Sequence, residues 1–373
     1  VGTFFLFEAM QMYFANGGGP CYVISVDNFP EATATATQNV VASKFGTAQT
    51  GALAEILKLD EPTLILFPEA TGLSLAAYKG IVESGLQVAA EMQDRFTLID
   101  TPKGLDLTTG TTNLTSFRTA LSSENLKFGA AYYPFLEANL AWSWDIDACT
   151  YGGTTLKSLK DSGSQDYNKA LEVLANTDSL KVILPPSPAV AGVYAKIDND
   201  QGVWVAPANV ALQSVIKPVQ AISEGKQASL NIDATAGKSI NAIRNFTGRG
   251  TLVWGARTLA GNDNEWRYVP VRRLFLSAEE SIRKATAPFV FSANDAQTWV
   301  KVSSMIASYL DSLWRQGALM GAKAEDAYFV KVGLGTTMTQ ENVLNGEMIV
   351  EVGLAAVRPA EFIVMKFYHH LNQ

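Results

Sequence analysis

The chain has 373 residues, 47% of them hydrophobic and 17% charged, which is the composition of a folded globular protein long enough for two domains. Its formal net charge of −7 argues against general binding of nucleic acids or anionic membranes, because such binding relies on a basic surface. No apolar run is long enough to predict a transmembrane helix, and no signal peptide is visible. Two cysteines, Cys21 and Cys149, do not indicate a disulfide-stabilised scaffold, and we expect both to be reduced thiols.

The first half of the chain alternates between helical and strand patterns. The sequence opens at Val1 inside a helical pattern, so we expect it to be a fragment. Helical spacing of apolar residues predicts helices over residues 4–14, 48–58, 73–95, 113–122 and 166–176. Short apolar runs predict strands over residues 22–26, 63–67, 96–100, 128–133 and 181–184. This alternation is typical of βαβ units, and we therefore expect residues 1–184 to form an α/β domain with a largely parallel sheet.

A stiff segment at residues 185–188, Pro-Pro-Ser-Pro, is the expected domain boundary. Beyond it, strands are predicted over residues 251–254, 267–271, 327–332, 348–352 and 362–367. Helices are predicted over residues 278–285 and 294–316, and Asn294 is the expected N-cap of the second. This mixture predicts an α+β domain over residues 185–373.

Three carboxylates lie at or just beyond the ends of predicted strands: Asp27, Glu69 and Asp100. The carboxyl edge of an open parallel sheet is where ligands usually bind, and carboxylates there can hold Mg²⁺ or act as a general base. An α/β enzyme that uses Asp27 and Asp100 is therefore one hypothesis, and solvated or capping carboxylates are the other. The only histidines, His369 and His370, are adjacent near the end of the sequence, and they do not suggest a metal site or a catalytic triad.

Residues 240–275 reverse the local sign of charge, because they carry six arginines and two tryptophans, Trp254 and Trp266. The arginines are Arg244, Arg249, Arg257, Arg267, Arg272 and Arg273. Arginine favours planar, partly desolvated ion pairs with carboxylates. The partners are either carboxylates of the same chain or acidic surface on another copy of it, and both alternatives stay open.

The predicted strand near the end of the sequence has two apolar faces, so both faces should be covered. Its residues are Glu361, Phe362, Ile363, Val364, Met365, Lys366 and Phe367. Such a strand is either the middle of its own sheet or part of a sheet shared with a neighbouring molecule. Arg315 and Lys323 lie near the end of the longest predicted helix, where the helix dipole favours cations.

Four stretches together resemble the contractile tail sheath family. They are NFTGRGTLVWGARTL with the following EWRYVPVRRLF, PPSPAVAGVYAKIDNDQGVWVAPANV, WRQGALMGAKAEDAYFVKV and VGLAAVRPAEFIVMKF. They cover most of the chain after Pro185, in the order of the family. The first half of the chain matches more weakly, through NGGGPCYVISV and TLILFPEA.

The resemblance implies a structural subunit, without cofactor or enzymatic activity, of a phage tail, a bacteriocin or an extracellular injection system. Such subunits polymerise helically around an inner tube, contract from a metastable extended state, and also meet baseplate and terminal cap proteins. The family further implies that an N-terminal arm precedes Val1 and that residues 361–367 join a sheet shared between subunits. It makes the six arginines candidates for lattice ion pairs, and Arg315 and Lys323 candidates for contact with the tube. We expect no direct contact with nucleic acid or membrane, and the alternatives are the α/β enzyme and a static shell protein.

Overall fold

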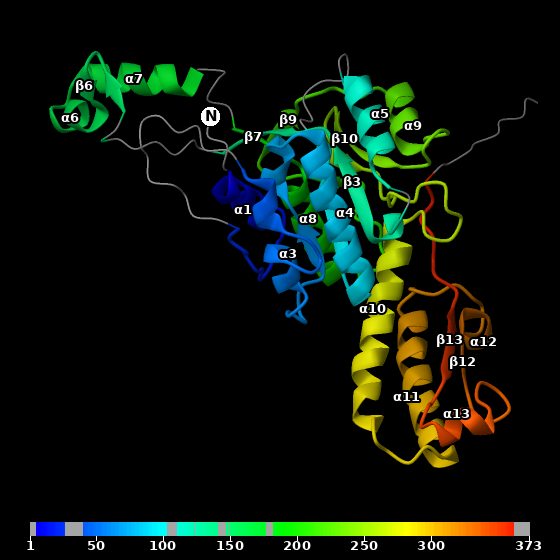
Figure 1. Ribbon diagram of the computed structural model, residues 1–373. Coiled ribbons are helices and arrows are strands. Elements are labelled where there is room, and N and C mark those ends of the chain that lie inside the picture. Colours follow the sequence, from blue (N-terminus) through cyan, green and yellow to red (C-terminus); the bar gives the residue numbers. More distant parts are fainter. Residues whose placement is uncertain are drawn as a thin grey trace, which may run out of the picture. The chain divides into compact units, whose positions relative to one another are not determined.

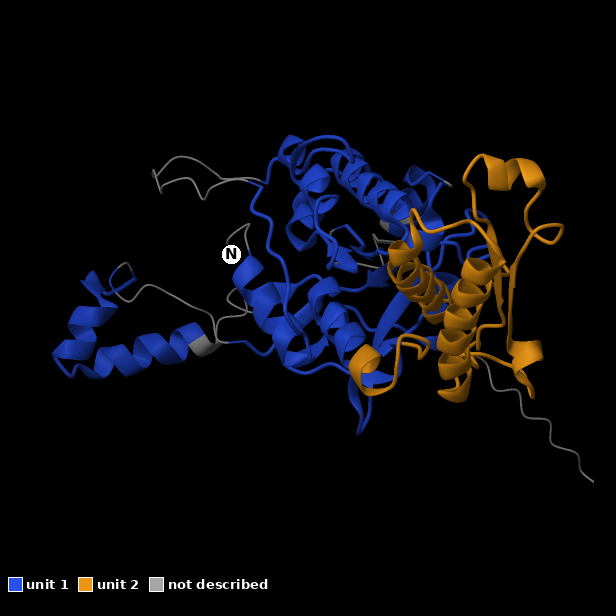
Figure 2. Ribbon diagram, turned by 90° about the horizontal axis from the view of Figure 1, so that it is seen from below, with its two compact units in different colours: residues 1–196, 207–263 blue, residues 197–206, 264–373 orange. Residues whose placement is uncertain are grey.

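The computed structural model describes residues 5–26, 40–102, 110–122, 124–140, 147, 149–176 and 182–361. The chain divides into two compact units (Figure 2). Unit 1 comprises residues 1–196 and 207–263, and unit 2 comprises residues 197–206 and 264–373. This division differs from the boundary expected at residues 185–188. The proline-rich segment there is largely buried and leads directly into helix α8 (Ser187–Asp200), most of which belongs to unit 1.

A six-stranded sheet forms the centre of unit 1 (Figure 1). Its strands, in spatial order, are β1 (Leu64–Leu66), β2 (Phe96–Asp100), β3 (Gly129–Tyr133), β10 (Ile240–Phe246), β11 (Gly250–Trp254) and β8 (Val210–Ala211). The first four strands pair in parallel, whereas β11 pairs antiparallel with β10 and with β8. The expected α/β architecture with a largely parallel sheet is confirmed.

Helix α4 (Leu75–Met92) packs on β2 and fixes the position of that strand. The Ser74 hydroxyl caps the helix by accepting the Ala77 N–H at 3.4 Å, and one face of α4 is buried through Tyr78, Ile81, Val82, Leu86 and Ala89. All five residues of β2 are buried, as expected for a strand with a covered sheet face on both sides. The Tyr78 hydroxyl donates to the Asp100 carbonyl oxygen at 2.6 Å, which ties the start of the helix to the end of the strand.

The remaining helices of unit 1 outside residues 149–176 are short. They are α1 (Leu6–Ala15), α2 (Ala42–Phe45), α3 (Gly51–Ile56), α5 (Gly110–Ala120), α9 (Glu224–Asn231) and the 3-10 turns η1 (Pro68–Gly72) and η2 (Leu126–Phe128). A second sheet has the order β7 (Val182–Leu184), β4 (Leu136–Ala138), β9 (Val215–Pro218), and all of its pairs are antiparallel. The strand predicted at residues 22–26 is absent, because the described residues supply no strand to pair with it.

Residues 149–176 form a small module with its own core. It contains β5 (Thr150–Tyr151), β6 (Thr154–Thr155), α6 (Leu156–Asp161) and α7 (Gln165–Asn176). Leu156, Leu159 and Ala170 are buried in it, and Tyr167 and Leu174 pack around them.

Unit 2 is built on two long helices. Its elements are α10 (Val269–Thr286), η4 (Ala287–Phe289), α11 (Ala296–Arg315), α12 (Ala324–Ala327), β12 (Tyr328–Val332), α13 (Gln340–Leu344) and β13 (Val350–Leu354). The strand predicted at residues 267–271 is wrong, since α10 starts at Val269 with Pro270 in its first turn, a position that proline favours. The helix predicted at residues 278–285 is the second half of α10. The longest helix, α11, is close to its predicted range, but Asp295 rather than Asn294 is its N-cap.

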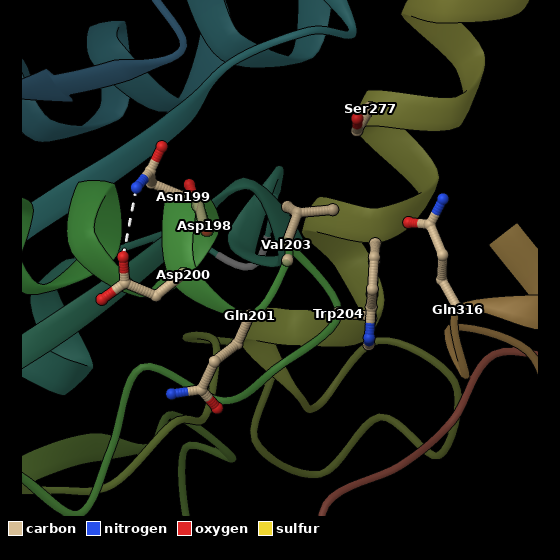
Figure 3. A pocket seen from close by; sticks show the side chains of 9 residues that line it. Asp198, Asn199, Asp200, Gln201, Val203, Trp204, Ser277 and Gln316 are labelled. Atoms are coloured by element: carbon tan, nitrogen blue, oxygen red, sulfur yellow. Dashed lines mark hydrogen bonds between the residues drawn. The ribbon is translucent and has the colours of Figure 1, made fainter.

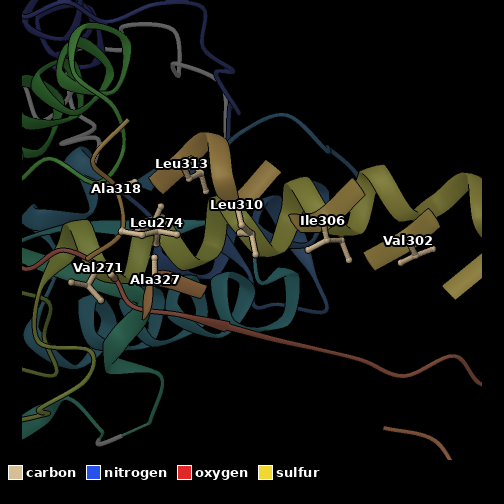
Figure 4. Close-up of a cluster of buried hydrophobic side chains, with 10 residues drawn as sticks. Val271, Leu274, Val302, Ile306, Leu310, Leu313, Ala318 and Ala327 are labelled. Atoms are coloured by element: carbon tan, nitrogen blue, oxygen red, sulfur yellow. The ribbon is translucent and has the colours of Figure 1, made fainter. Parts of the chain in front are cut away.

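The core of unit 2 lies along α11 (Figure 4). Val302, Ile306, Leu310 and Leu313 recur at helical spacing and are buried together with Leu274 of α10. Strands β12 and β13 pair antiparallel and form a two-stranded sheet, and Val330 and Val352 contribute to the cover of this core.

Candidate functional site

Asp100 is the predicted enzymatic residue that the structure describes, and it is 1% exposed at the end of β2. One of its carboxylate oxygens accepts the Ser187 N–H at 2.7 Å, and the other accepts the Ser187 hydroxyl at 2.6 Å. Ser187 begins helix α8, so the carboxylate sits at a helix N-terminus, where the helix dipole favours an anion. Burial raises the pKa of Asp100 to about 7, and the two hydrogen bonds from Ser187 oppose the rise.

These contacts give Asp100 a structural task, namely joining β2 to α8. Glu69 has a similar one, because its carboxylate accepts the N–H groups of Phe5 and Leu6 at 3.2 and 3.1 Å, beside the first turn of α1. Burial raises the pKa of Glu69. Asp27 lies outside the described residues, as do His369 and His370. Within the described part of the chain, the carboxylates predicted at strand ends bind backbone and hydroxyl groups of the fold itself.

The arginines of residues 240–275 differ in burial. Arg257 is 4% exposed, and its guanidinium donates to the carbonyl oxygens of Asn231 and Gly261 at 3.4 and 3.3 Å. Arg244 is half-buried and donates to Gln227 Oε1 at 2.6 Å, and its guanidinium carbon lies 5.0 Å from the centre of the Phe246 ring. Unlike these two, Arg249 is exposed, and it donates to Asn209 Oδ1 at 2.6 Å.

The other three arginines belong to unit 2. Arg273 is 6% exposed and forms a bidentate ion pair with Asp198, with N–O distances of 2.8 and 2.5 Å. Arg272 is 2% exposed, stacks over Trp266 at 4.8 Å and lies 3.6 Å from a Glu279 carboxylate oxygen. Its burial lowers the pKa of its guanidinium, which the Glu279 carboxylate opposes.

Arg267 is half-buried and donates to the Asn264 side chain. The six arginines therefore do not form one cluster. Arg272 and Arg273 have carboxylate partners inside their own unit, which agrees with the intramolecular alternative for these two, whereas Arg257 donates to backbone carbonyl oxygens. A lattice role stays a prediction, and the exposed Arg249 offers the most accessible guanidinium.

The sheet of unit 2 has two strands, and among the described residues neither outer edge pairs with another strand. The Ala355 N–H donates to the Ala327 carbonyl oxygen at 2.9 Å, so alternation along the strand directs the amide groups of Val352 and Leu354 away from β12. By the same alternation, the Val330 amide of β12 faces the opposite outer edge. The sequence predicts both strands, but it does not show that neither outer edge has a further strand beside it among the described residues.

The predicted shared strand begins at the limit of the described residues. Glu361 is described and is not in a strand, and its carboxylate accepts the Tyr268 hydroxyl at 3.2 Å, which fixes this position to unit 2. Phe362, Ile363, Val364, Met365, Lys366 and Phe367 lie outside the described residues. Their pairing stays a prediction.

The two cations predicted to contact a tube are both exposed. Arg315 is the last residue of α11, its side chain is 73% exposed, and it pairs with Asp311 at 2.7 Å. Lys323 precedes α12 and is exposed. None of the helices in the described part of the chain combines the length and the apolar character that crossing a membrane would require.

Comparison with known proteins identifies relatives of the whole chain. A family model described as the phage tail sheath C-terminal domain matches residues 261–369. The tail sheath protein of Enterobacteria phage T4 is 21% identical over 369 residues, which are 95% of this chain and 50% of that protein. The tail sheath protein of Burkholderia phage BcepMu is 27% identical over 161 residues, 42% of this chain and 33% of that protein. The chain thus spans about half or less of the length of these curated relatives.

Solved structures give higher identity. The sheath complex of PVC, an extracellular contractile injection system, in its contracted state has a TM-score of 0.69 and 35% identity over 97% of this chain and 80% of that chain. The helical sheath of the anti-feeding prophage (AFP), also contracted, has a TM-score of 0.67 and 35% identity over 97% of this chain and 81% of that chain. With this identity over nearly its whole length, the chain belongs to the tail sheath family of contractile phage tails and injection systems.

Proposed function

We propose that this chain is the sheath subunit of a contractile injection particle. It polymerises helically around an inner tube and contracts from a metastable extended state, and this movement drives the tube through a target envelope. The observation that carries the proposal is 35% identity to sheath subunits from two injection systems, both in the contracted state. The role is structural and mechanical, and the hydrogen bonds that occupy Asp100 support it over an enzymatic role.

Assembly in this proposal depends on the two-stranded sheet of unit 2. A sheet edge with free N–H and C=O groups pairs readily with an extended segment of another chain. The strand predicted at residues 361–367 of a neighbouring subunit is the proposed donor, because both of its faces are apolar and need cover. Glu361 is held by Tyr268, so the donated segment starts from a fixed point on unit 2. Each subunit would therefore be tethered to the next through backbone hydrogen bonds.

Charged side chains at the surface supply further lattice contacts. Arg249 is our main candidate for an inter-subunit ion pair, since it is exposed and its partner in the structure is the neutral Asn209. Arg244 is a further candidate, because it is half-buried and its hydrogen-bond partner Gln227 is neutral, and the half-buried Arg267 is another. We also propose that Arg315 and Lys323 face an acidic surface of the inner tube. The subunits at the two ends of the sheath would meet the baseplate and a terminal cap protein.

Contraction needs no nucleotide in this proposal. If each subunit buries roughly 300 Å² more apolar surface in the contracted lattice, about 25 cal/mol per Å² gives about 7 kcal/mol per subunit. Summed over many subunits this is enough to drive a tube, with the units moving as rigid bodies while shared strands keep them connected.

Electron microscopy of the purified protein, alone and with its inner tube protein, tests the proposal. We expect hollow striated tubes, and two tube diameters would distinguish a contracting sheath from a static shell. Truncation after Pro359 should leave folded subunits that do not polymerise. If wild-type protein forms no tubes with or without the inner tube protein, the proposed function is refuted.

Two proline substitutions test the edges separately. Val352→Pro removes an N–H on the open edge of β13 and spares the N–H groups that face β12. Val330→Pro does the same on the open edge of β12. If one of the two variants forms no tubes while its unit 2 remains folded, as judged by slow hydrogen exchange, then the edge altered in that variant receives the partner strand. Tubes that form normally from both variants and from the truncated chain would exclude strand sharing.

A further inference from the structure

Unit 2 contains a hollow of about 570 Å³ at the end of helix α8. The proposed sharing of strands between subunits does not involve this hollow. The last turn of α8, the residues that follow it, α10 and Gln316, which caps the end of α11, all contribute to its lining. In Figure 3, Asn199 and Asp200 lie on one side of the hollow, and Trp204 and Gln316 lie on the opposite side. Ser277 of α10 completes the lining.

The aromatic wall of this hollow is held in place by the backbone. Gly202, two residues after α8, has φ +106°, a conformation that favours glycine, and its N–H donates to the Ile197 carbonyl oxygen at 3.0 Å. A Cβ on Gly202 would lie 2.5 Å from the Trp204 ring, so the indole rests directly on this turn. Trp204 also packs against the buried cluster of unit 2. The hollow therefore has a fixed aromatic surface on one side.

The opposite side of the hollow is electronegative. Asp198 and Asp200 both lie in the last turn of α8, which contains no basic residue, and the exposed carbonyl end of a helix adds partial negative charge. Arg273 compensates Asp198 through its bidentate ion pair, whereas Asp200 accepts a hydrogen bond from the neutral Asn199 amide at 3.1 Å. No lysine or arginine is among the residues found to line the hollow in the described chain. Asp200, a carboxylate without a cationic partner in the lining, and the Trp204 ring thus line opposite sides of the same hollow.

We infer that this hollow receives a lysine or arginine side chain from a second copy of this chain. The inference rests on the proposed polymerisation. The Asp200 carboxylate would accept a charge-assisted hydrogen bond, and the Trp204 ring would attract the cation through its π face. The side-chain oxygens of Ser277 and Gln316 can accept further N–H groups. Copies of the chain carry suitable side chains, since Lys301 and Lys331 are exposed.

A contact of this kind suits a helical lattice. It joins two different surfaces, the hollow of one copy and a cation of the next, so it is a heterologous contact that can repeat without closing. An acidic side chain from a partner would be repelled by Asp200, and an apolar one would leave the carboxylate without a counter-charge. The charge of the lining therefore selects which surface of a neighbour fits.

The test compares tubes of wild type with those of Asp200→Asn and Trp204→Leu. We expect Asp200→Asn to raise the subunit concentration for half-maximal assembly about tenfold or more, the range for losing a hydrogen bond to a charged group. Trp204→Leu should raise it as well. Asp166→Asn is the matched control, because Asp166 is a carboxylate of the small module with a lysine partner, Lys169, at 2.8 Å. We expect this control to assemble like wild type.

A cryo-EM reconstruction of wild-type tubes gives an independent answer that does not depend on how the variants fold. We expect a lysine or arginine of a neighbouring copy between Asp200 and Trp204. If tubes form but the hollow holds no such side chain, or if Asp200→Asn assembles like wild type, this inference is overturned and the proposed function survives. If wild-type protein forms no tubes, both proposals fail together.

Discussion

Replacing Asp100 with asparagine should remove a pH dependence from the stability of unit 1. Burial raises the pKa of this carboxyl from its usual 3.8 to about 7. The folded protein therefore holds the proton more tightly than the unfolded chain does. The stabilisation is complete below about pH 4 and is lost as the pH rises through 7.

The magnitude follows from the change in pKa. Each pKa unit is worth about 1.36 kcal/mol, so the full effect is about 4 kcal/mol, of which about 2 kcal/mol falls between roughly pH 5.5 and pH 8. The asparagine side chain of the variant would stay neutral throughout. Its carbonyl oxygen can accept the Ser187 N–H, and its amide can donate to the Ser187 hydroxyl, so the two contacts are kept. Asp100→Asn should therefore gain about 2 kcal/mol relative to wild type over this pH range.

Hydrogen exchange of the β2 amides is the appropriate assay, because the two units can unfold separately and a single denaturation midpoint would mix them. Opening free energies of wild type and Asp100→Asn are compared at both pH values. Asp166→Asn serves as a control, since it removes an exposed carboxylate. Equal pH dependence in wild type and Asp100→Asn would refute the reasoning, as it would mean that burial of Asp100 costs nothing.

Three further predictions concern unit 2. Arg273→Met breaks the ion pair with Asp198 and should lower the free energy of unfolding by roughly 2 kcal/mol, less than for a fully buried pair because the Asp198 side chain is 29% exposed. Leu310→Ala should cost about 3 kcal/mol, since Leu310 is 0% exposed and the change leaves a cavity. Gly353→Ala places a Cβ 2.1 Å from the Phe329 ring and should cost about 1 kcal/mol, as this half-exposed ring must move. Urea denaturation monitored by hydrogen exchange of β12 and α11 measures all three.

Each of these three substitutions has a control variant. Arg315→Met removes an exposed arginine, and it should change stability by less than about 0.5 kcal/mol. Leu344→Ala truncates a leucine that is 78% exposed, and the same small limit of about 0.5 kcal/mol applies. In a Phe329→Ala background, Gly353→Ala should lose its cost, because the clashing ring is gone. A loss for Leu344→Ala as large as that for Leu310→Ala would contradict the described core.

Strands buried on both sides were the easiest elements to predict. Residues 96–100 were predicted with the observed bounds of β2, because a short apolar run between polar flanks identifies a covered strand. The parallel arrangement followed from the alternation with α4 and α5. The strand predicted at residues 267–271 failed because its apolar residues also fit a helical face, and Pro270 was not recognised as a helix start.

Pairing partners were not predictable from local pattern. The segment 22–26 is as apolar as a strand, but a strand also needs a neighbour, and the described residues supply none. Likewise, the charge of Arg273 was evident, whereas its partner Asp198 comes from the distant end of α8. The hollow beside Trp204 could not be predicted from the sequence, because its lining combines residues 198–204 with Ser277 and Gln316, which are far apart along the chain.

The parallel pairing of β10 with β3 has a consequence for synthesis on the ribosome. Ala131 pairs with Ile240, so the edge of β3 stays uncovered until residues far downstream have been translated. During that interval the nascent chain exposes a row of unpaired amides on β3, and an unpaired strand edge of this kind promotes aggregation. Strands β12 and β13 emerge only after β10 and β11 have been made. The order of elements along the chain thus lets the central sheet of unit 1 form before β12 and β13 leave the ribosomal exit tunnel.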